Sequence, residues 1–400
     1  TAGKPAAVAN LARRWLTAPI EDFDRELLAI NVINGTLRFA VEAAADGRRS
    51  VAVALDRHRR EDMITRLAPV EYDPEAPSPL YDGMIAWAQP EAPLRRYLHQ
   101  VGGYAATGDT GEHKLWFLYG RGRNGKSTTI DAWCSALGDY SGTIGIESFL
   151  DQGIKKRGDA ATPDLAKLGG VRMLRASEPE RGAKLNSALV KAATGGEPMS
   201  VRALHRGFFD LTPRFKLLMS GNSKPAIPDT DEGIWSRMKL VPWLRNIDQP
   251  EPGVENWPKK DPKLLDRIKA AELPGVFARL VEGLVDWLEH GFVEPEQVTV
   301  ATAVYREQSD PLARFLRLCT EPSDDPKDRV KSSDLYDAFG GWCKAAGEKV
   351  WSPRGFSDAM ADKGFTKTRS DGMRWEKLKL LRTAADFVDA EGNVRVSLPD

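Results

Sequence analysis

Residues 115–128 read Leu115-Trp-Phe-Leu-Tyr-Gly120-Arg-Gly-Arg-Asn-Gly125-Lys126-Ser127-Thr128, a stretch that predicts a strand, a loop and a helix in succession. The five apolar residues 115–119 have the composition of a buried parallel strand. The glycines that follow favour a turn, because glycine suits neither a strand nor a helix interior. Residues 127–137 have helical composition. We therefore expect an α/β fold with a parallel sheet.

The spacing of Gly120, Gly125 and the two residues after them, Lys126 and Ser127, fits the phosphate-binding pattern G-x-x-x-x-G-K-[ST]. In such a P-loop, backbone N–H groups surround the phosphates, the lysine reaches the β and γ phosphates, and the hydroxyl ligates Mg²⁺. The sequence thus predicts a nucleoside triphosphate and Mg²⁺ as cofactors. The predicted nucleotide-binding residues are Gly120, Arg121, Gly122, Arg123, Asn124, Gly125, Lys126, Ser127 and Thr128.

Two other interpretations fit the same glycines. Gly120, Gly122 and Gly125 also form G-x-G-x-x-G, and Glu147 lies at about the distance where a dinucleotide-binding fold has its ribose-binding acid. Such a fold has no use for Lys-Ser directly after the last glycine, whereas a triphosphate–Mg²⁺ site needs both. The remaining alternative is a chance glycine turn, so the P-loop is favoured.

A second chemical element is the apolar run from Val171, which leads to the acids Glu178 and Glu180. A P-loop NTPase needs an acid beside its phosphates to hold Mg²⁺ and to polarise the attacking water. Glu178 is the first choice for this role. Glu180 can share the metal role, in addition to the Ser127 hydroxyl. A strand that merely ends in solvated acids is the alternative.

Three features follow downstream. Residues 198–211 predict a hairpin with His205 and Arg206 at a basic tip, which suits a phosphate backbone but also fits an ordinary solvated turn. The strand 215–220 leads to Asn222, whose amide can orient the attacking water. Arg237 stands just ahead of another strand and can reach a neighbouring subunit's γ phosphate, or form a surface salt bridge.

These motifs in this order resemble the superfamily 3 helicases, in particular the phage and plasmid primase-helicases related to the poxvirus primase-helicase. The resemblance covers nearly the whole chain. It includes Asn31-Val-Ile-Asn-Gly35, the P-loop, Ala193-Thr-Gly-Gly-Glu197 and Met219-Ser-Gly-Asn222. It implies an AAA+ ATPase that forms a ring, uses ATP with Mg²⁺ and moves along single-stranded DNA.

The resemblance also implies roles for single residues: Lys126 and Ser127 in Walker A, Glu178 in Walker B, His205 and Arg206 at the DNA-contacting hairpin, Asn222 as sensor 1 and Arg237 as the trans-acting finger.

Three positions depart from the family pattern. Glu197 stands where Asp is usual, Ser223 where His is common, and Ser236 replaces the first of a frequent Arg-Arg pair. The last departure leaves Arg237 as the finger candidate.

Composition bounds the remaining possibilities. The chain has 400 residues, 42% of them hydrophobic, which suffices for two or three domains. With 57 basic and 57 acidic residues, any contact with a polyanion must come from local patches. The cysteines Cys134, Cys319 and Cys343 have no zinc or disulfide spacing and fit a reducing compartment. The resemblance to phage and plasmid proteins implies that this compartment is the cytoplasm of a bacterial host cell. No membrane span or signal peptide is expected.

We expect four domains: an N-terminal α+β accessory domain over residues 1–112, the AAA+-like P-loop ATPase core over 113–250, a helical connection over 251–326 and a winged-helix-like domain over 327–400. Helices are predicted over 1–29, 80–102, 276–288 and 305–319. In the tail, Ser333 is expected to cap a helix over 334–346, and Ser352 and Pro353 to start a second.

The tail also has a local basic patch. Residues 363–382 contain seven Lys or Arg against two Asp or Glu, in a chain that is neutral overall. This favours contact with DNA, whereas a charged module that touches only protein is the alternative. The predicted DNA-binding residues there are Lys363, Lys367, Arg369 and Arg374.

The favoured function is an ATP-dependent DNA helicase, the helicase part of a phage or plasmid primase-helicase, acting as a homo-hexamer or similar ring. Its expected partners are single-stranded DNA, replication fork DNA and a primase domain in the same polypeptide, since the start at Thr1 suggests a longer protein. One alternative is an ATP-switched initiator or loader that binds DNA without unwinding it. A P-loop kinase is the other.

Overall fold

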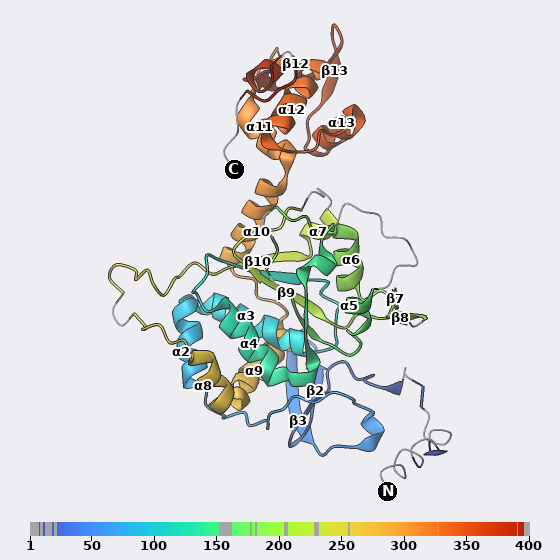
Figure 1. Ribbon diagram of the computed structural model, residues 1–400, viewed down its shortest axis with the longest axis vertical. Helices are drawn as coiled ribbons and strands as arrows, with labels where there is room; N and C mark the ends of the chain where they lie inside the picture. Colours follow the sequence, from blue (N-terminus) through green and yellow to red (C-terminus); the bar gives the residue numbers. More distant parts are fainter. Residues whose placement is uncertain are drawn as a thin grey trace. The chain divides into compact units, whose positions relative to one another are not determined.

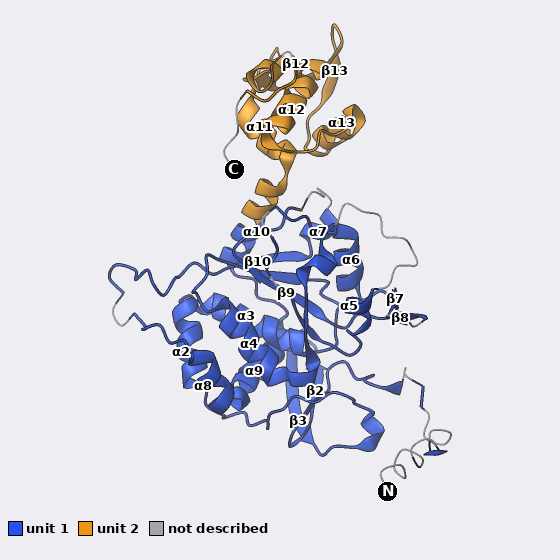
Figure 2. Cartoon of the chain, in the orientation of Figure 1, with its two compact units in different colours: residues 1–226, 231–302 blue, residues 227–230, 303–400 orange. Residues whose placement is uncertain are grey.

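The computed structural model describes residues 8, 11–12, 18–19, 22–151, 162–176, 178–180, 182–203, 207–227, 232–254, 257–325, 327–389 and 391–395. The chain divides into two compact units (Figure 2). Unit 1 consists of residues 1–226 and 231–302, and unit 2 of residues 227–230 and 303–400. The predicted domain boundaries at residues 112, 250 and 326 remain predictions.

A five-stranded parallel sheet forms the centre of unit 1 (Figure 1). Its strand order is β10-β4-β9-β6-β5, and every neighbouring pair is parallel. The strand predicted at residues 115–119 is β4, between β10 and β9. The strands are β4 (Leu115–Tyr119), β5 (Ser141–Ile144), β6 (Met173–Ala176), β9 (Lys216–Gly221) and β10 (Met238–Pro242). The predicted α/β class with a parallel sheet is confirmed.

One face of this sheet packs against helices that share a single hydrophobic core with it. These helices are α2 (Pro79–Ala88), α3 (Ala92–Ala106), α4 (Lys126–Leu137), α8 (Leu264–Ala271) and α9 (Leu273–His290). Alternate residues of β4, Trp116 and Leu118, belong to this core, as expected for side chains that alternate between the faces of a strand. The helix predicted over 276–288 lies in α9, and Gly291 follows its last residue.

The remaining elements of unit 1 complete the sheet's surroundings. They are α5 (Pro163–Ala166), α6 (Ser187–Gly195), α7 (Glu232–Trp235) and the antiparallel hairpin of β7 (Met199–Arg202) and β8 (Phe208–Leu211). Short 3-10 turns lie at Arg60–Asp62, Gly138–Tyr140 and Ile146–Phe149. Helix α10 (Glu296–Ser309) begins in unit 1. The hairpin predicted at residues 198–211 is confirmed.

A small antiparallel sheet precedes the parallel one. It consists of β1 (Ile30–Val32), β2 (Gly35–Ala43) and β3 (Arg49–Asp56). Ile30, Val32 and Leu37 are fully buried in the same core as α3 and α9. Most of the helix predicted over 1–29 lies outside the described residues. Residues 25–29 are described and form no helix, so that part of the prediction is wrong.

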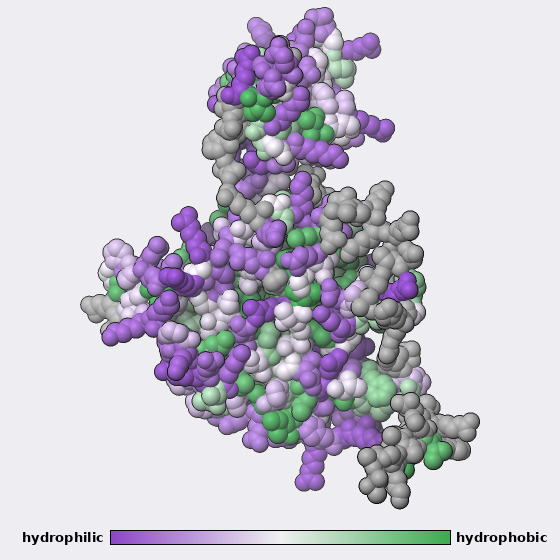
Figure 3. Space-filling view, viewed as in Figure 1, coloured by the Kyte–Doolittle hydropathy of each residue, from purple (hydrophilic) through white to green (hydrophobic). Residues whose placement is uncertain are grey.

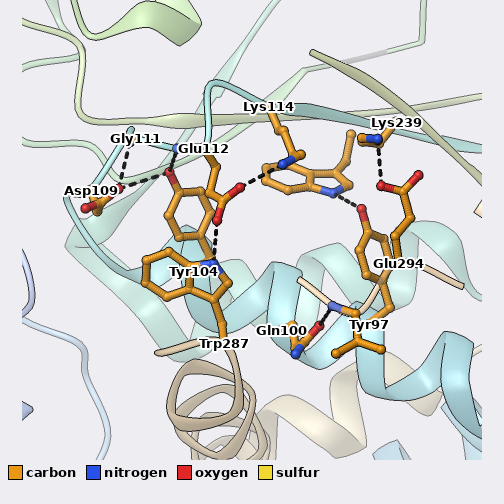
Figure 4. A network of polar contacts seen from close by, with 12 residues as sticks. Tyr97, Gln100, Tyr104, Asp109, Gly111, Glu112, Lys114, Lys239, Trp287 and Glu294 are labelled. Atoms are coloured by element: carbon orange, nitrogen blue, oxygen red, sulfur yellow. Dashed lines mark hydrogen bonds and ion pairs between the residues drawn. The ribbon is translucent and has the colours of Figure 1, made fainter. Parts of the chain in front are cut away.

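A polar network ties α9 to the segment that leads into β4 (Figure 4). Trp287 Nε1 donates to Glu112 Oε1 at 2.9 Å, and Lys114 Nζ donates to Glu112 Oε2 at 2.7 Å. Burial raises the pKa of Glu112, but these two hydrogen bonds together with the positive charges of Lys114 and Arg49 outweigh it, so the pKa lies below its ordinary value. Nearby, Trp116 Nε1 donates to Tyr97 Oη at 2.9 Å. The bonds satisfy polar groups that an aromatic core would otherwise leave unpaired.

A buried lysine fastens the amino-terminal edge of the parallel sheet. Lys216 is the first residue of β9 and is 2% exposed. Its ammonium donates to the backbone carbonyl of Thr107, to that of Asp109 at 3.1 Å and to that of Arg214 at 3.2 Å. Three carbonyl oxygens thus take the place of the water that the ammonium gives up on burial.

A buried arginine also fastens the amino-terminal edge of the parallel sheet, at the start of β6. Arg172 is 3% exposed and donates from Nη1 to the carbonyls of Ala29 at 2.8 Å and Ala106 at 3.1 Å. Ala106 is the last residue of α3, where the helix dipole is negative. The two cations therefore join the end of α3 to two strands of the sheet without any carboxylate partner among these contacts.

Unit 2 has its own hydrophobic core, formed by aromatic residues that include Phe315, Phe339, Trp342 and Trp375. Its strands form a three-stranded antiparallel sheet in the order β12-β14-β13 and the pair β11-β15. The elements are α11 (Pro311–Cys319), β11 (Thr320–Pro322), β12 (Arg329–Lys331), α12 (Ser332–Ala346), α13 (Pro353–Asp362), β13 (Lys367–Arg369), β14 (Met373–Glu376), β15 (Leu378–Leu380) and a 3-10 turn at Ala384–Asp386.

Two local predictions in this region need correction. Ser333 is not the cap of α12, because the helix already begins at Ser332; its hydroxyl donates to Asp334 at 2.9 Å instead. The single helix predicted over 305–319 is two helices, since Pro311 lacks an N–H donor and starts α11, with Asp310 as its cap. Ser352 caps α13 through Gly355 N–H, and Pro353 starts that helix, as predicted.

The surface is mostly polar, in contrast to the hydrophobic cores of the two units. Hydrophilic side chains cover most of the visible face, with hydrophobic ones scattered between them (Figure 3). Within the described residues, none of the helices combines the length and the apolar character that crossing a bilayer requires.

We expect Lys216→Met to lower the free energy of unfolding by about 2–4 kcal/mol, because methionine fills the space but leaves three carbonyl oxygens without their donor. Urea denaturation monitored by circular dichroism measures this. The control is Lys167→Met, at an exposed lysine after α5, where a change within about 0.5 kcal/mol is expected. A Lys216→Met effect as small as the control's would contradict the anchoring role.

Candidate functional site

A cleft of about 360 Å³ opens where β4, β6 and β9 end. Its size lies in the range of small-molecule sites. The cleft is lined by Gly122, Arg123, Asn124, Gly125, Lys126, Ser127, Thr128, Arg175, Glu178, Ser220, Gly221 and Asn222. It therefore contains most of the predicted nucleotide-binding residues, whereas Gly120 and Arg121 lie outside its lining.

The loop between β4 and α4 has the conformation that its glycines permit. Gly125, directly before α4, has φ 86°, a left-handed value that suits glycine. A Cβ atom on Gly120 would lie 2.0 Å from the carbonyl oxygen of Trp243, so a side chain there would collide with the backbone after β10. The backbone N–H groups in the first turn of α4 have no partners within the helix, and this end of the helix lies at the cleft. Such a helix end favours the binding of anions.

Lys126 begins α4, and its side chain is held by oxygens. Nζ donates to the Gly120 carbonyl at 2.7 Å, to Asn124 Oδ1 at 3.1 Å and to Asn222 Oδ1 at 3.4 Å. Burial lowers the pKa of Lys126 to about 8, although the nearby Glu178 carboxylate acts in the opposite direction. The ammonium is thus placed at the loop, where a phosphate would meet it.

Glu178 and Asn222 meet because their strands are neighbours. Ala176 of β6 pairs with Met219 of β9, so the residues that follow each strand lie side by side. A carboxylate oxygen of Glu178 accepts a hydrogen bond from the backbone N–H of Asn222. Glu180 is exposed and does not line the cleft. Of the two predicted acids, the structure brings Glu178 to the P-loop.

Strand order argues against the dinucleotide interpretation. In a dinucleotide-binding fold the strand after the first helix pairs with the first strand. Here β9 and β6 separate β4 from β5, and Glu147 lies in the 3-10 turn beyond β5. The alternative acid is therefore remote from the loop in the sheet.

Sequence reasoning missed Arg175. This residue lies on β6, lines the cleft, and its guanidinium forms an ion pair with Asp131 of α4. The pair crosses from the sheet to the helix that begins at the P-loop. A charged residue inside an otherwise apolar strand was the available signal, since such a residue needs a partner or a function when half-buried.

Arg237 lies at the other end of the sheet. It directly precedes β10, whose first residue Met238 pairs with Leu115 at the start of β4. The P-loop is thus about 17 Å away along the strand, at about 3.3 Å per residue. The Arg237 guanidinium donates to the Gly233 carbonyl at 3.0 Å and to Thr194 Oγ1 at 3.1 Å. Arg237 therefore does not join the cleft of its own chain.

The predicted tip of the β7–β8 hairpin, His205 and Arg206, lies outside the described residues. The stem is described and has a feature that sequence reasoning missed. Phe208 and Phe209 of β8 are 52% and 43% exposed, and the Arg202 guanidinium lies 5.5 Å from the Phe208 ring centre. Two neighbouring phenylalanines at the end of a short strand were the signal.

The predicted DNA-binding residues of unit 2 cluster on one hairpin and the end of α13. Lys367 and Arg369 lie on β13 and Arg374 on β14, whereas Lys363 follows α13. Several are already engaged: Lys363 pairs with Asp310 at 2.5 Å, and Arg374 pairs with the exposed Asp371 at 3.5 Å. Their role in DNA binding remains a prediction.

Comparisons with known proteins identify relatives among viral proteins. Residues 2–90 match the family described as D5 N terminal like. The chain is 26% identical over 272 residues to a putative helicase of Acanthamoeba polyphaga mimivirus, and 26% identical over 270 residues to one of Frog virus 3 (isolate Goorha). The chain is related to the primase-helicase type of helicase. The resemblance seen in its motifs is confirmed.

These alignments cover 66% and 64% of this chain but 28% and 27% of the viral proteins, so the chain spans less than two thirds of the relatives' length. Among solved structures, the apo form of the NrS-1 C-terminal region (305–718) matches with a TM-score of 0.43 and 9% identity. That match covers 85% of this chain and 96% of the other.

The lowered pKa of Lys126 predicts a pH-dependent affinity for nucleotide. The ammonium is present below its pKa of about 8 and is lost as the pH rises through it, so phosphates lose their cationic partner. We expect the dissociation constant of ATP to rise about tenfold between about pH 7.5 and pH 9, measured by calorimetry. Lys126→Arg, which stays charged, should flatten this dependence. Equal pH profiles in both proteins would contradict the assignment.

Proposed function

We propose that this chain is the ATP-dependent DNA helicase part of a phage or plasmid primase-helicase. It forms a homo-hexamer or similar ring, hydrolyses ATP between subunits and moves along single-stranded DNA at the replication fork in the host cell. The observation that carries the proposal is the convergence of Lys126, Glu178 and Asn222 on one cleft from three neighbouring strands. The relatives described as putative helicases support it.

The residues of the cleft fit ATP and Mg²⁺. The glycine loop before α4 presents backbone donors suited to phosphates, and the Ser127 hydroxyl and the Glu178 carboxylate are the oxygen ligands that Mg²⁺ prefers. Bound ATP supplies the phosphoanhydride bond, and Mg²⁺ neutralises the charge that develops on its phosphates. Glu180 lies outside the cleft, so we give the acid's role to Glu178.

Each residue then has a separate task. Lys126 offers its ammonium to the β and γ phosphates, and it must leave the oxygens that now hold it to do so. Asn222 orients the attacking water through its amide, and Glu178 accepts a proton from that water. The bond from Asn222 N–H to Glu178 keeps the carboxylate beside the amide. Hydrolysis is thereby coupled to the end of β9.

The position of Arg237 supports a ring. An arginine about 17 Å from its own P-loop can stabilise the charge on the γ phosphate only at another subunit's site. Its bonds to the Gly233 carbonyl and Thr194 orient the guanidinium near the amino-terminal end of β10. We therefore propose that each active site is completed by Arg237 of a neighbouring copy.

The other parts suit contact with DNA. The β7–β8 hairpin, with His205 and Arg206 in its loop, would follow the strand. In unit 2, the order α11, β12, α12, α13, β13, β14 supports a winged-helix-like domain, with Lys363, Lys367, Arg369 and Arg374 near its hairpin. The D5 N terminal like match over residues 2–90 supports a separate accessory region ahead of the AAA+ core. A primase domain would belong to the same polypeptide.

The first test is ATP hydrolysis with and without single-stranded DNA, run beside size-exclusion chromatography. Glu178→Gln should bind ATP but lose hydrolysis by about 10²-fold or more, because an amide cannot accept the proton. Glu180→Gln is the matched control and should remain close to wild type. A larger effect of Glu180→Gln would overturn the choice of acid. Hydrolysis that is independent of DNA and of assembly would favour a P-loop kinase.

The shared active site is tested by mixing variants. We expect Arg237→Ala to bind ATP almost normally yet to lose roughly three orders of magnitude in turnover. Lys126→Ala should be inactive for lack of its own cation. Mixing the two should restore activity, because some interfaces then pair an intact P-loop with an intact arginine. No recovery where subunits exchange would contradict the ring.

A further inference from the structure

A second cleft, of about 550 Å³, lies at the amino-terminal edge of the parallel sheet, opposite the P-loop. Gly169 and Gly170 shortly precede β6, and Arg214 shortly precedes β9, so the cleft belongs to the far end of these strands. All of its lining residues are in unit 1. They are Ala18, Phe23, Asp24, Thr65, Arg66, Gly169, Gly170, Thr212 and Arg214.

The two arginines of this cleft are placed by backbone carbonyls. Arg66 donates from Nη2 to the carbonyl of Gly169, and Arg214 donates from Nη1 to the carbonyl of Asp24. The Nε atom of Arg66 is buried and has no hydrogen-bond partner among the described residues. Within that part of the chain, neither guanidinium forms an ion pair with a carboxylate. Each therefore retains donors for an anion.

The acid of the cleft is engaged elsewhere. Asp24 Oδ1 accepts from the Thr65 N–H at 2.8 Å, and Asp24 Oδ2 accepts from the Thr65 hydroxyl at 2.6 Å. Both oxygens thus hold the segment that places Arg66. With two arginines and one aspartate, the lining retains a positive charge, and planar guanidinium groups suit phosphate oxygens.

The cleft continues the β7–β8 hairpin. Thr212 and Arg214 follow directly after β8, on which Phe208 and Phe209 are exposed. Exposed aromatic rings stack on bases, and cations beside them hold the backbone of a single strand. A strand that contacts the hairpin stem therefore has a positively charged cleft at the base of that stem.

We propose that this cleft binds the phosphodiester backbone of single-stranded DNA through Arg66 and Arg214, as an extension of the hairpin. The proposal rests on the proposed function, because it takes the DNA strand as the source of the phosphate. Arg66 and Arg214 supply the contacts, and Phe208 stacks on a base.

The experiment measures the affinity for fluorescein-labelled oligothymidylate by anisotropy over a series of salt concentrations. We expect Arg66→Gln with Arg214→Gln to weaken binding about tenfold and to lower the slope of log affinity against log salt by about 1.4, as for two lost contacts to a single strand. The matched control is Arg48→Gln with Arg267→Gln, two exposed arginines outside the cleft, which should change neither value.

Conservative variants separate binding from folding. Arg66→Lys with Arg214→Lys should keep the salt slope but bind less tightly, because lysine retains the charge and loses the planar fork. Loss of affinity that follows the melting temperature alone, with the slope unchanged, would overturn the proposal. Phe208→Ala should weaken binding without changing the slope, since stacking involves no counterion release.

The outcomes also separate this inference from the proposed function. If the wild-type protein fails to bind the oligonucleotide, the helicase proposal fails and this inference fails with it. If the wild type binds and the Gln double variant binds equally, only the cleft is wrong. Inorganic phosphate tests the other source: if it stabilises the wild type but not the Gln variant while DNA affinity is unchanged, the cleft binds free phosphate and the DNA backbone is excluded.

Discussion

Parallel pairing of β9 between β4 and β6 is the constraint on which the candidate site depends. Because carboxyl ends of parallel strands meet at one edge, the P-loop after β4, Glu178 after β6 and Asn222 after β9 come together there. A single cleft results from segments that are about a hundred residues apart in the chain. Exchange of β9 with β5 in the sheet would place β9 at the far edge and separate the amide from the loop, although every local motif would remain intact.

At the opposite edge of the sheet, buried cations hold the strands in place. Lys216 and Arg172 bring positive charge into the interior and satisfy it with backbone carbonyls, two of which, from Ala106 and Thr107, lie at the end of α3. Ion pairs with carboxylates are the more usual solution for buried cations. Carbonyl partners instead tie the strands to a helix end and to the segment before β1. The cleft with Arg66 and Arg214 is built on the same edge.

Under the proposed function, the two edges of the sheet have separate tasks. One edge would hold the triphosphate, and at the other the β7–β8 hairpin and the second cleft offer cations and exposed rings. Strand β9 extends from Lys216 at one edge to Gly221 at the other. A shift at the γ phosphate that moves Asn222 would thus act on an element that begins near Arg214. Under the proposed function, the same strand would connect the nucleotide site with the DNA site.

Local chemistry determined much of what the sequence revealed. The apolar strand, glycine loop and Lys126-Ser127 were predictable because their spacing is itself the binding geometry, and the hairpin over residues 198–211 was predictable from the turn between its two strands. The break before Pro311 and the start of α12 at Ser332 were missed because helix ends depend on competing caps. Only the tertiary structure decided that Glu178 rather than Glu180 reaches the cleft, that Arg175 joins it, and that Arg237 lies at the opposite edge of the sheet. These outcomes depend on strand order and register, which contacts between distant residues determine and neighbouring residues do not.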